Sequence, residues 1–119
     1  MSCVLIVEDD PDVRQMMELF VNSNGYNAVT AENGREGLAR MRECLPCLVL
    51  LDLQMPVMDG FEFRRRQLSD AELAAIPVLC ITAHYKPSTI SEELGVACLG
   101  KPADFDRLGS EIRRICGSS

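Results

Sequence analysis

The chain has 119 residues, of which 47% are hydrophobic and 25% are charged, so it suits one globular domain with a continuous core and leaves no room for two. Lys and Arg number 12 against 18 Asp and Glu, and the net charge of −6 excludes binding to nucleic acid or to anionic membranes through bulk charge. We therefore expect a single domain over residues 1–119 that does not bind nucleic acid or membranes directly.

Short apolar runs predict five β-strands along the chain. The first, third and fourth runs are continuously apolar, which is typical of strands that helices cover on both faces of a parallel sheet. The predicted strands are Cys3–Val7, Tyr26–Thr30, Cys47–Leu51, Val78–Thr82 and Ala97–Leu99.

Amphipathic stretches between these runs predict the helices. Apolar residues over Val13–Val21 recur at helical spacing, with Asp10 as an N-cap and Pro11 in the first turn. The other helices are expected behind Asn33, over about Phe61–Leu68, over about Thr89–Leu94 and behind Asp104. This alternation of strands and helices predicts a three-layer α/β/α sandwich with right-handed crossovers.

In such a sheet, functional side chains gather beyond the carboxyl ends of the strands. Glu8 and Asp9 follow the first strand, Asp52 follows the third, Thr82 ends the fourth and Lys101 follows the fifth. Carboxylates that lie close together require a cation, and their hard oxygen atoms suit Mg²⁺. A lysine and a hydroxyl at the same edge supply the charge and the hydrogen bond that a phosphoryl group needs. The residues therefore predict an Mg²⁺-assisted phosphoryl site with a carboxylate as the possible nucleophile.

Four segments of the sequence resemble response-regulator receiver domains of two-component signalling (CheY-like domains) in order and in spacing. The segments are VLIVEDDPDVR, LVLLDLQMPVMDGFE, VLCITAH and GKP, and the most specific feature is the Asp followed by MP-x-MDG. The resemblance covers the whole chain. It implies a flavodoxin-like fold with a five-stranded parallel sheet in the strand order 2-1-3-4-5.

The resemblance also implies a role for each acidic residue of the site. Asp52 would be the phosphoacceptor. Glu8 and Asp9 would hold Mg²⁺ together with Asp52 and the backbone carbonyl of Gln54. Asp10 lies one place past the acidic pair and would only cap the following helix.

On the other side of the site, Thr82 would hydrogen-bond the phosphoryl group and report its presence. The N–H of Ala83 would face the phosphoryl oxygens and Lys101 would pair with them, while Pro102 permits a cis peptide bond after the lysine. Members of the family usually have Tyr or Phe three residues before this lysine, and here that position is Cys98. The sequence thus departs from the family at the aromatic residue of the usual switch.

The implied function is a regulatory phosphoacceptor rather than an enzyme. A histidine kinase or a phosphotransfer protein would phosphorylate Asp52, the domain would catalyse only its own phosphorylation and dephosphorylation, and its affinity for a partner would change. The sequence does not identify the output partner. It also does not say whether the chain stands alone or precedes a further domain.

Three other functions fit the sequence less well. A phosphatase of the haloacid dehalogenase type typically has an acid two residues after its nucleophile, where this chain has Gln54. A flavin-binding module needs a phosphate loop rich in Ser, Thr or Gly after the first strand, and the segment EDDPDV would repel phosphate. An inert pseudo-receiver is disfavoured by the presence of Asp52, Thr82 and Lys101. The arginines of Arg64–Arg66 and Arg113–Arg114 are interpreted as solvated helix faces rather than a nucleic-acid surface.

The six cysteines are predicted to be reduced thiols of a cytoplasmic protein. No apolar run approaches the roughly 18 residues that cross a bilayer, and the N-terminus carries no secretion signal. Cys44 and Cys47 have the C-x-x-C spacing of a redox pair, but they are predicted to follow a helix, whose dipole there favours the protonated thiol. With one His and no second C-x-x-C pair, a structural zinc site is not expected.

Overall fold

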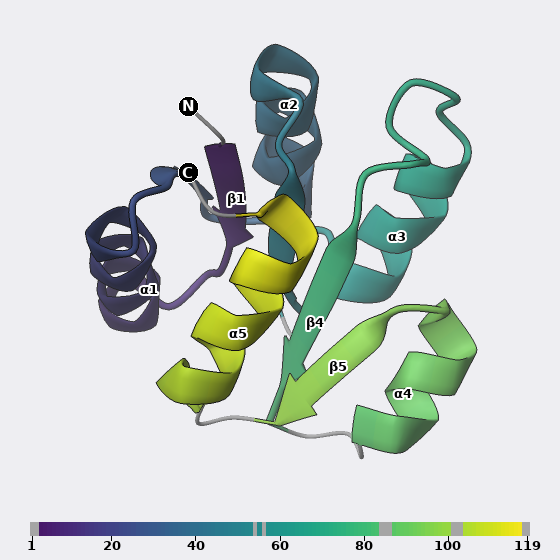
Figure 1. The fold of residues 1–119 in the computed structure, drawn as a ribbon. Coiled ribbons are helices and arrows are strands. Elements are labelled where there is room, and N and C mark those ends of the chain that lie inside the picture. Colours follow the sequence, from purple (N-terminus) through teal and green to yellow (C-terminus); the bar gives the residue numbers. More distant parts are fainter. Residues whose placement is uncertain (1–2, 54, 56, 84–86, 101–103, 118–119) are drawn as a thin grey trace.

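A computed structural model of the chain describes residues 3–53, 55, 57–83, 87–100 and 104–117. Five parallel strands form one sheet in the order β2-β1-β3-β4-β5 (Figure 1). This arrangement confirms the predicted fold class and strand order. The strands are β1 (Cys3–Val7), β2 (Asn27–Ala31), β3 (Leu48–Asp52), β4 (Val78–Thr82) and β5 (Ala97–Gly100).

Each strand is followed by a helix, as the sequence predicts. The helices are α1 (Pro11–Ser23), α2 (Gly34–Cys44), α3 (Gly60–Leu68), α4 (Pro87–Leu94) and α5 (Phe105–Cys116). Side chains accept backbone N–H groups at four of the helix starts, because the first N–H groups of a helix have no partner within it. These caps are Asp10 for α1, Asn33 for α2, Asp59 for α3 and Asp104 for α5. Among the described helices, none combines the length and the apolar character that crossing a bilayer requires.

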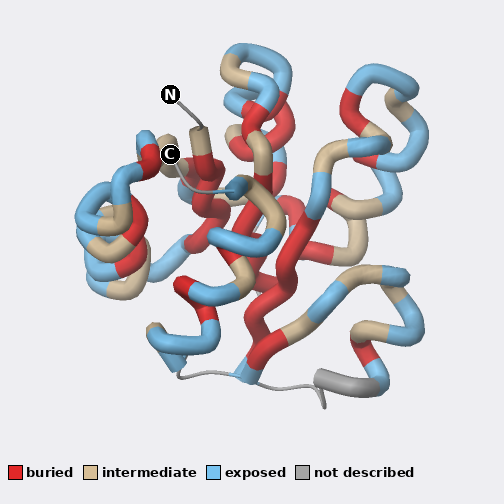
Figure 2. The backbone as a smooth tube through the Cα atoms, in the orientation of Figure 1, coloured by how far each residue is buried: buried red, intermediate tan, exposed pale blue. Residues whose placement is uncertain are grey.

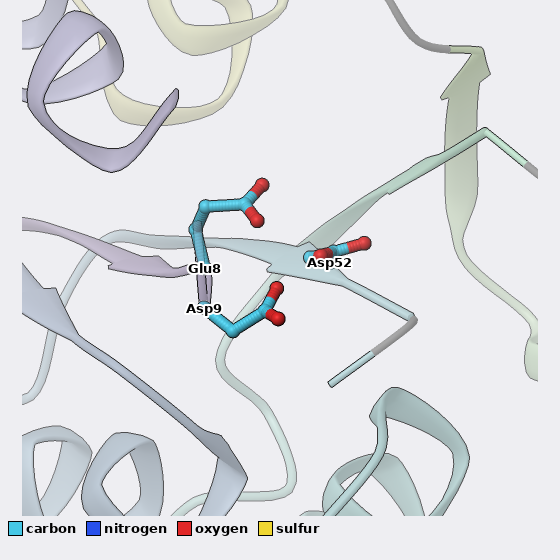
Figure 3. A group of neighbouring side chains, drawn as sticks. All are labelled: Glu8, Asp9 and Asp52. Carbon is cyan, nitrogen blue, oxygen red and sulfur yellow. The ribbon is translucent and has the colours of Figure 1, made fainter. Parts of the chain in front are cut away.

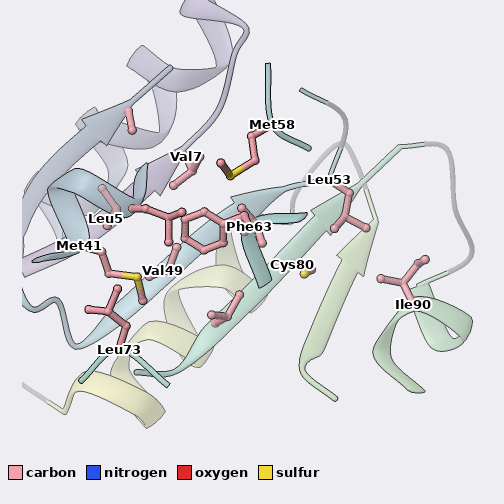
Figure 4. Packing of buried hydrophobic residues seen from close by; sticks show 14 residues of the cluster. Leu5, Val7, Met41, Val49, Leu53, Met58, Phe63, Leu73, Cys80 and Ile90 are labelled. Carbon is pink, nitrogen blue, oxygen red and sulfur yellow. The ribbon is translucent and has the colours of Figure 1, made fainter. Parts of the chain in front are cut away.

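One face of the sheet packs against α2, α3 and α4 (Figure 4). Leu5 and Val7 of β1 point into this layer, where they meet Met41 of α2 and Phe63 of α3, and all four side chains are buried. The helix α2 approaches the sheet closely at Gly37. A Cβ atom there would lie 2.9 Å from Val7 Cγ2 and 3.1 Å from Phe63 Cε2, so the absence of a side chain lets the layers meet.

The opposite face of the sheet packs against α1 and α5. Val4 and Ile6 alternate with the residues of the first layer and join Val21 of α1 with Leu108 and Ile112 of α5. The central strands are therefore buried on both sides, as Figure 2 shows along β4. Continuously apolar strands are the sequence signature of this double coverage.

The prediction that all six cysteines are reduced thiols is wrong. Cys47, just before β3, forms a disulfide with Cys116, the last residue of α5, and their Cα atoms are 5.5 Å apart. The two residues are 69 positions apart in the sequence. They meet because α5 runs antiparallel to the strands and ends near the point where β3 begins. Cys44 has the C-x-x-C spacing to Cys47 in the sequence, but the disulfide of Cys47 is formed with Cys116. The free cysteines are Cys3, Cys44, Cys80 and Cys98.

Candidate functional site

Three carboxylates meet beyond the carboxyl ends of β1 and β3 (Figure 3). One carboxylate oxygen from each of Glu8, Asp9 and Asp52 lies within 4.8 Å of the other two. The strand register brings them together, because Val7 of β1 pairs with Leu51 of β3 and the next residue of each strand follows alongside. The structure thus gathers three of the residues that the sequence assigns to a metal site.

These three carboxylates differ in their exposure to solvent. The residues Glu8 and Asp52 are only 2% and 4% exposed, whereas Asp9 is exposed. Two buried carboxylates repel each other in a medium that screens charge poorly, and a divalent cation offsets this repulsion. Oxygen donors with one side open to water are the environment that Mg²⁺ prefers. The donor set therefore fits Mg²⁺, with Asp9 on the solvent side.

Hydrogen bonds to the backbone fix the turn that carries the acidic pair. The N–H of Glu8 donates to the carbonyl of Ala31 at 3.1 Å, which continues the pairing of β1 with β2. Arg14 reaches back from α1, and its Nη1 donates to the carbonyl oxygens of Glu8 and Asp9 at 2.9 and 3.3 Å. This role of Arg14 was not predicted from the sequence. Its acceptors are backbone carbonyls, which carry no sequence signal of their own.

Asp10 has the capping role that the sequence predicts for it. Its Oδ1 accepts the N–H groups of Asp12 at 2.9 Å and of Val13 at 3.3 Å at the start of α1. Among the described residues, the group of acids close enough to share a metal ion includes Glu8 and Asp9 but not Asp10. The consecutive acids of this loop thus divide between a cation site and a helix cap.

The start of α3 lies close to the end of β3. The N–H of Gly60, the first residue of α3, donates to the carbonyl of Leu53 at 3.1 Å. A Cβ atom on Gly60 would lie 2.5 Å from Leu53 Cδ2 and 2.8 Å from Leu53 Cα, which no side chain could occupy. Asp59 caps α3 through the N–H of Glu62 at 2.9 Å. The contact between Gly60 and Leu53 places the start of α3 directly against the residue that follows Asp52.

Thr82 lies at the carboxyl end of β4, on the same side of the sheet as the acidic cluster. Asp52 pairs with Ile81 of β4, so Thr82 is the next residue along the neighbouring strand, and it is only 1% exposed. Ala83 follows it and is exposed to solvent. A buried hydroxyl followed by an exposed small residue is compatible with the predicted contacts to a phosphoryl group.

Three of the predicted site residues, Gln54, Lys101 and Pro102, lie outside the described residues. Cys98 of β5 is half-buried and pairs with Cys80 of β4. Together with Ser91 and Arg107, it lines a hollow of about 420 Å³ between α4, β5 and α5. The small thiol thus stands beside open space at the position where the family usually has an aromatic ring.

Comparison with known proteins agrees with this geometry. A profile of the response regulator receiver domain matches residues 4–113. Protein PilH of Pseudomonas aeruginosa is 38% identical over 82 residues, which cover 69% of this chain and 68% of PilH. Response regulator Rre1 of Synechocystis sp. is 30% identical over 116 residues, which cover 94% of this chain but 50% of Rre1, so the chain spans half the length of that relative.

A solved structure shows the same architecture along its whole length. The chemotaxis protein CheY4 of Vibrio cholerae matches with a TM-score of 0.86 at 30% sequence identity, and the match covers 97% of this chain and 98% of that one. The family profile covers nearly all of the sheet and its helices, including every described residue of the acidic cluster. The chain therefore belongs to the family of response regulator receiver domains of two-component signalling.

Proposed function

We propose that this receiver domain is a phosphoacceptor switch in which Asp52 takes a phosphoryl group from a histidine kinase or a phosphotransfer protein. Phosphorylation then changes the affinity of the domain for an output partner or domain. The proposal rests on one observation above all, the meeting of Glu8, Asp9 and Asp52 at the end of the central strands. The domain acts as a regulator, and its only catalysis is the phosphorylation and dephosphorylation of its own Asp52.

Asp52 has the position that a nucleophile needs. It is the last residue of the central strand β3, where it pairs with Ile81 of β4 while the preceding Leu51 pairs with Val7 of β1. One carboxylate oxygen attacks the phosphorus of the phosphohistidine, the P–N bond breaks, and the imidazole nitrogen leaves with the electron pair. Later attack by water on the acyl phosphate releases inorganic phosphate and restores the carboxylate.

The remaining residues hold the group that is transferred. Glu8, Asp9 and Asp52, with the backbone carbonyl of Gln54, would hold Mg²⁺, and the ion would neutralise charge on the carboxylate and on the incoming phosphoryl oxygens. The Thr82 hydroxyl donates a hydrogen bond to a phosphoryl oxygen. The Ala83 N–H and the Lys101 ammonium would bind the other oxygens.

The net charge of the domain and the compartment of the reaction limit which partners it can have. The net charge of −6 disfavours contact with nucleic acid, so any binding to DNA would belong to another domain or protein. We place this function in the cytoplasm, because the phosphoryl groups that histidine kinases transfer derive from cytoplasmic ATP. Residues 1–119 would act there as one receiver unit.

Intact-mass measurement after incubation with acetyl phosphate and Mg²⁺ tests the proposal. The wild-type chain should gain the mass of one phosphoryl group, and Asp52→Asn should gain none. Asp12→Asn is the matched control, because this exposed acid of α1 lies outside the cluster and its loss should leave the gain unchanged. Equal labelling of Asp52→Asn and wild type, or labelling that EDTA does not reduce, would contradict the assignment.

A further inference from the structure

Four of the six cysteines lie near the amino ends of the strands. Asp52 lies at the opposite side of the sheet, where the strands have their carboxyl ends. Cys3 begins β1, Cys44 ends α2, Cys47 precedes β3 and Cys116 ends α5. The N–H of Cys47 donates to the carbonyl of Cys3 at 2.9 Å, so these two residues lie side by side at the start of adjacent strands. Cys47 and Cys116 already form a disulfide. Cys3 and Cys44 therefore stand as a thiol pair beside an oxidised pair.

The two thiols are in direct contact with each other. Cys3 Sγ donates a hydrogen bond to Cys44 Sγ at a distance of 3.0 Å, although the residues are 41 positions apart in the sequence. A disulfide bond is about 2.0 Å long, so a movement of roughly 1 Å would join the two sulfurs. Both residues are only half-buried, so a small reagent can approach them from solvent.

The environment assigns different roles to the two sulfurs. Burial, and then the neighbouring Cys44 sulfur, raise the pKa of Cys3 to about 12, so Cys3 keeps its proton and acts as the donor. Cys44 accepts this hydrogen bond, and because Cys3 holds its proton, we assign the first attack to the Cys44 sulfur.

We propose that Cys3 and Cys44 are a second, reversible disulfide site of this chain, oxidised by low-molecular-weight disulfides such as oxidised glutathione. Cys44 loses its proton to water and attacks one sulfur of oxidised glutathione, which breaks the S–S bond, forms a mixed disulfide and releases one glutathione thiolate. Cys3 then loses its proton to water and attacks the Cys44 sulfur, which releases the second glutathione. Two protein thiols are oxidised and one oxidised glutathione is reduced to two thiols, so the exchange balances.

Cys80 and Cys98 provide an internal comparison. They occupy paired positions on adjacent strands, β4 and β5. Cys80 has no exposed surface, however, and burial raises the pKa of its thiol to about 12, so a reagent in solution reaches neither its sulfur nor a thiolate. Oxidation should therefore be selective for the pair Cys3 and Cys44.

The new bond would tie the start of β1 to the end of α2, beside the bond that ties β3 to α5. The modification site lies near the amino ends of the strands, whereas Asp52 lies at a carboxyl end. The proposal for the cysteines does not depend on the proposed function of Asp52. Disulfides that occur in reducing compartments are usually transient or redox-sensing, which fits an exchangeable pair next to an oxidised one.

Thiol counting on the whole chain tests the proposal. Wild-type protein purified without reductant is incubated with oxidised glutathione, freed of it and titrated with Ellman's reagent under denaturing conditions. The number of free thiols should fall from four to two, and the intact mass should show no retained glutathione. The matched control Cys98→Ser should lose the same two thiols, because it keeps both members of the pair.

Two further variants identify the steps of the exchange. Cys3→Ser removes the resolving thiol and should trap one glutathione on Cys44, whereas Cys44→Ser should form no internal disulfide. Circular dichroism confirms that each variant is folded. The proposal is overturned if the wild-type chain keeps four thiols, or if Cys44→Ser loses as many thiols as the wild type does.

Discussion

The carboxylate oxygens of Glu8 and Asp52 lie within 4.8 Å of each other, although both side chains are almost completely buried. They leave neighbouring parallel strands in register, and the sheet holds their backbones in place. Two like charges at this separation repel each other, and a bound divalent cation would offset this repulsion. The Mg²⁺ ion that we propose for this site would therefore stabilise the domain by offsetting the repulsion between the two carboxylates.

Replacing Asp52 by Asn should stabilise the metal-free domain. The amide keeps the size of the side chain and removes one of the two buried charges, so the free energy of unfolding in EDTA should rise by about 1–3 kcal/mol. Added Mg²⁺ should raise the melting temperature of the wild type and leave that of Asp52→Asn nearly unchanged. Thermal melts of both proteins with EDTA and with Mg²⁺ measure this, and a variant less stable than wild type in EDTA would contradict the repulsion.

The neighbouring acids Asp9 and Asp10 should respond differently to truncation. Asp9→Ala should lose Mg²⁺ binding, because it removes the exposed carboxylate of the cluster. Asp10→Ala should keep Mg²⁺ binding and lose about 1 kcal/mol of stability, because it removes the cap that accepts the N–H groups of Asp12 and Val13. Titration calorimetry with Mg²⁺ and urea unfolding separate the two effects. Loss of Mg²⁺ binding in Asp10→Ala would place the acidic pair one residue further along.

Gly60 should be intolerant of even one added carbon. A Cβ atom would lie 2.8 Å from the Cα atom of Leu53, which is backbone and cannot move aside, so Gly60→Ala should cost about 1–3 kcal/mol and slow phosphorylation of Asp52. Gly109→Ala is the matched control on α5. There the Cβ atom would meet the flexible end of Arg113 at 3.2 Å and the ring of Phe20 at 3.3 Å, without touching backbone, and the gain in helix propensity offsets these contacts. Equal losses of stability in the two variants would show that the contact with Leu53 does not matter.

Much of this architecture could be predicted from local sequence patterns. Asp10, Asp59 and Asp104 mark helix starts by their chemistry, and the runs Cys3–Val7 and Val78–Thr82 match β1 and β4 to the residue. The second strand begins one residue later than predicted. Tyr26 is apolar enough to extend the predicted strand, but it is buried between α1 and α5, and its hydroxyl donates to the carbonyl of Gly117.

Contacts between distant segments could not be predicted in this way. The disulfide partner of Cys47 depends on where α5 ends in space, and no spacing rule reaches over 69 residues. The contact between Cys3 and Cys44 likewise depends on how α2 returns to the start of β1. Arg14 binds backbone carbonyls, which carry no sequence signal of their own. The acidic residues of the site could be identified from the sequence, but the contact of Arg14 that positions their backbone could not.

The disulfide between Cys47 and Cys116 should make a large contribution to stability. Closing a loop of 69 residues reduces the entropy of the unfolded chain, which corresponds to as much as about 4 kcal/mol. Cys116→Ser should therefore lower the midpoint of urea unfolding strongly, whereas Cys98→Ser should lower it little. Dithiothreitol should destabilise the wild type and leave Cys116→Ser unchanged. A midpoint that dithiothreitol does not alter in the wild type would exclude this contribution.

Signal transmission in this domain should not depend on Cys98. A small, half-buried thiol cannot sweep between an exposed and a buried position as an aromatic ring can, so the response to phosphorylation must reach α4 by another route. Packing provides one, because Leu53 directly follows Asp52 and belongs to the same buried cluster as Ile90 of α4 (Figure 4). A displacement at the end of β3 therefore bears on α4 through the core.

Amide chemical shifts with and without beryllium fluoride, a phosphoryl mimic, distinguish the two routes. The shifts of α4 on addition of the mimic should persist in Cys98→Ala, which removes the thiol. They should shrink in Ile90→Val, which removes one methylene from the buried cluster at a cost of about 1 kcal/mol and keeps the fold. If the α4 shifts vanish in Cys98→Ala while Ile90→Val responds like the wild type, then the thiol carries the signal and the core does not.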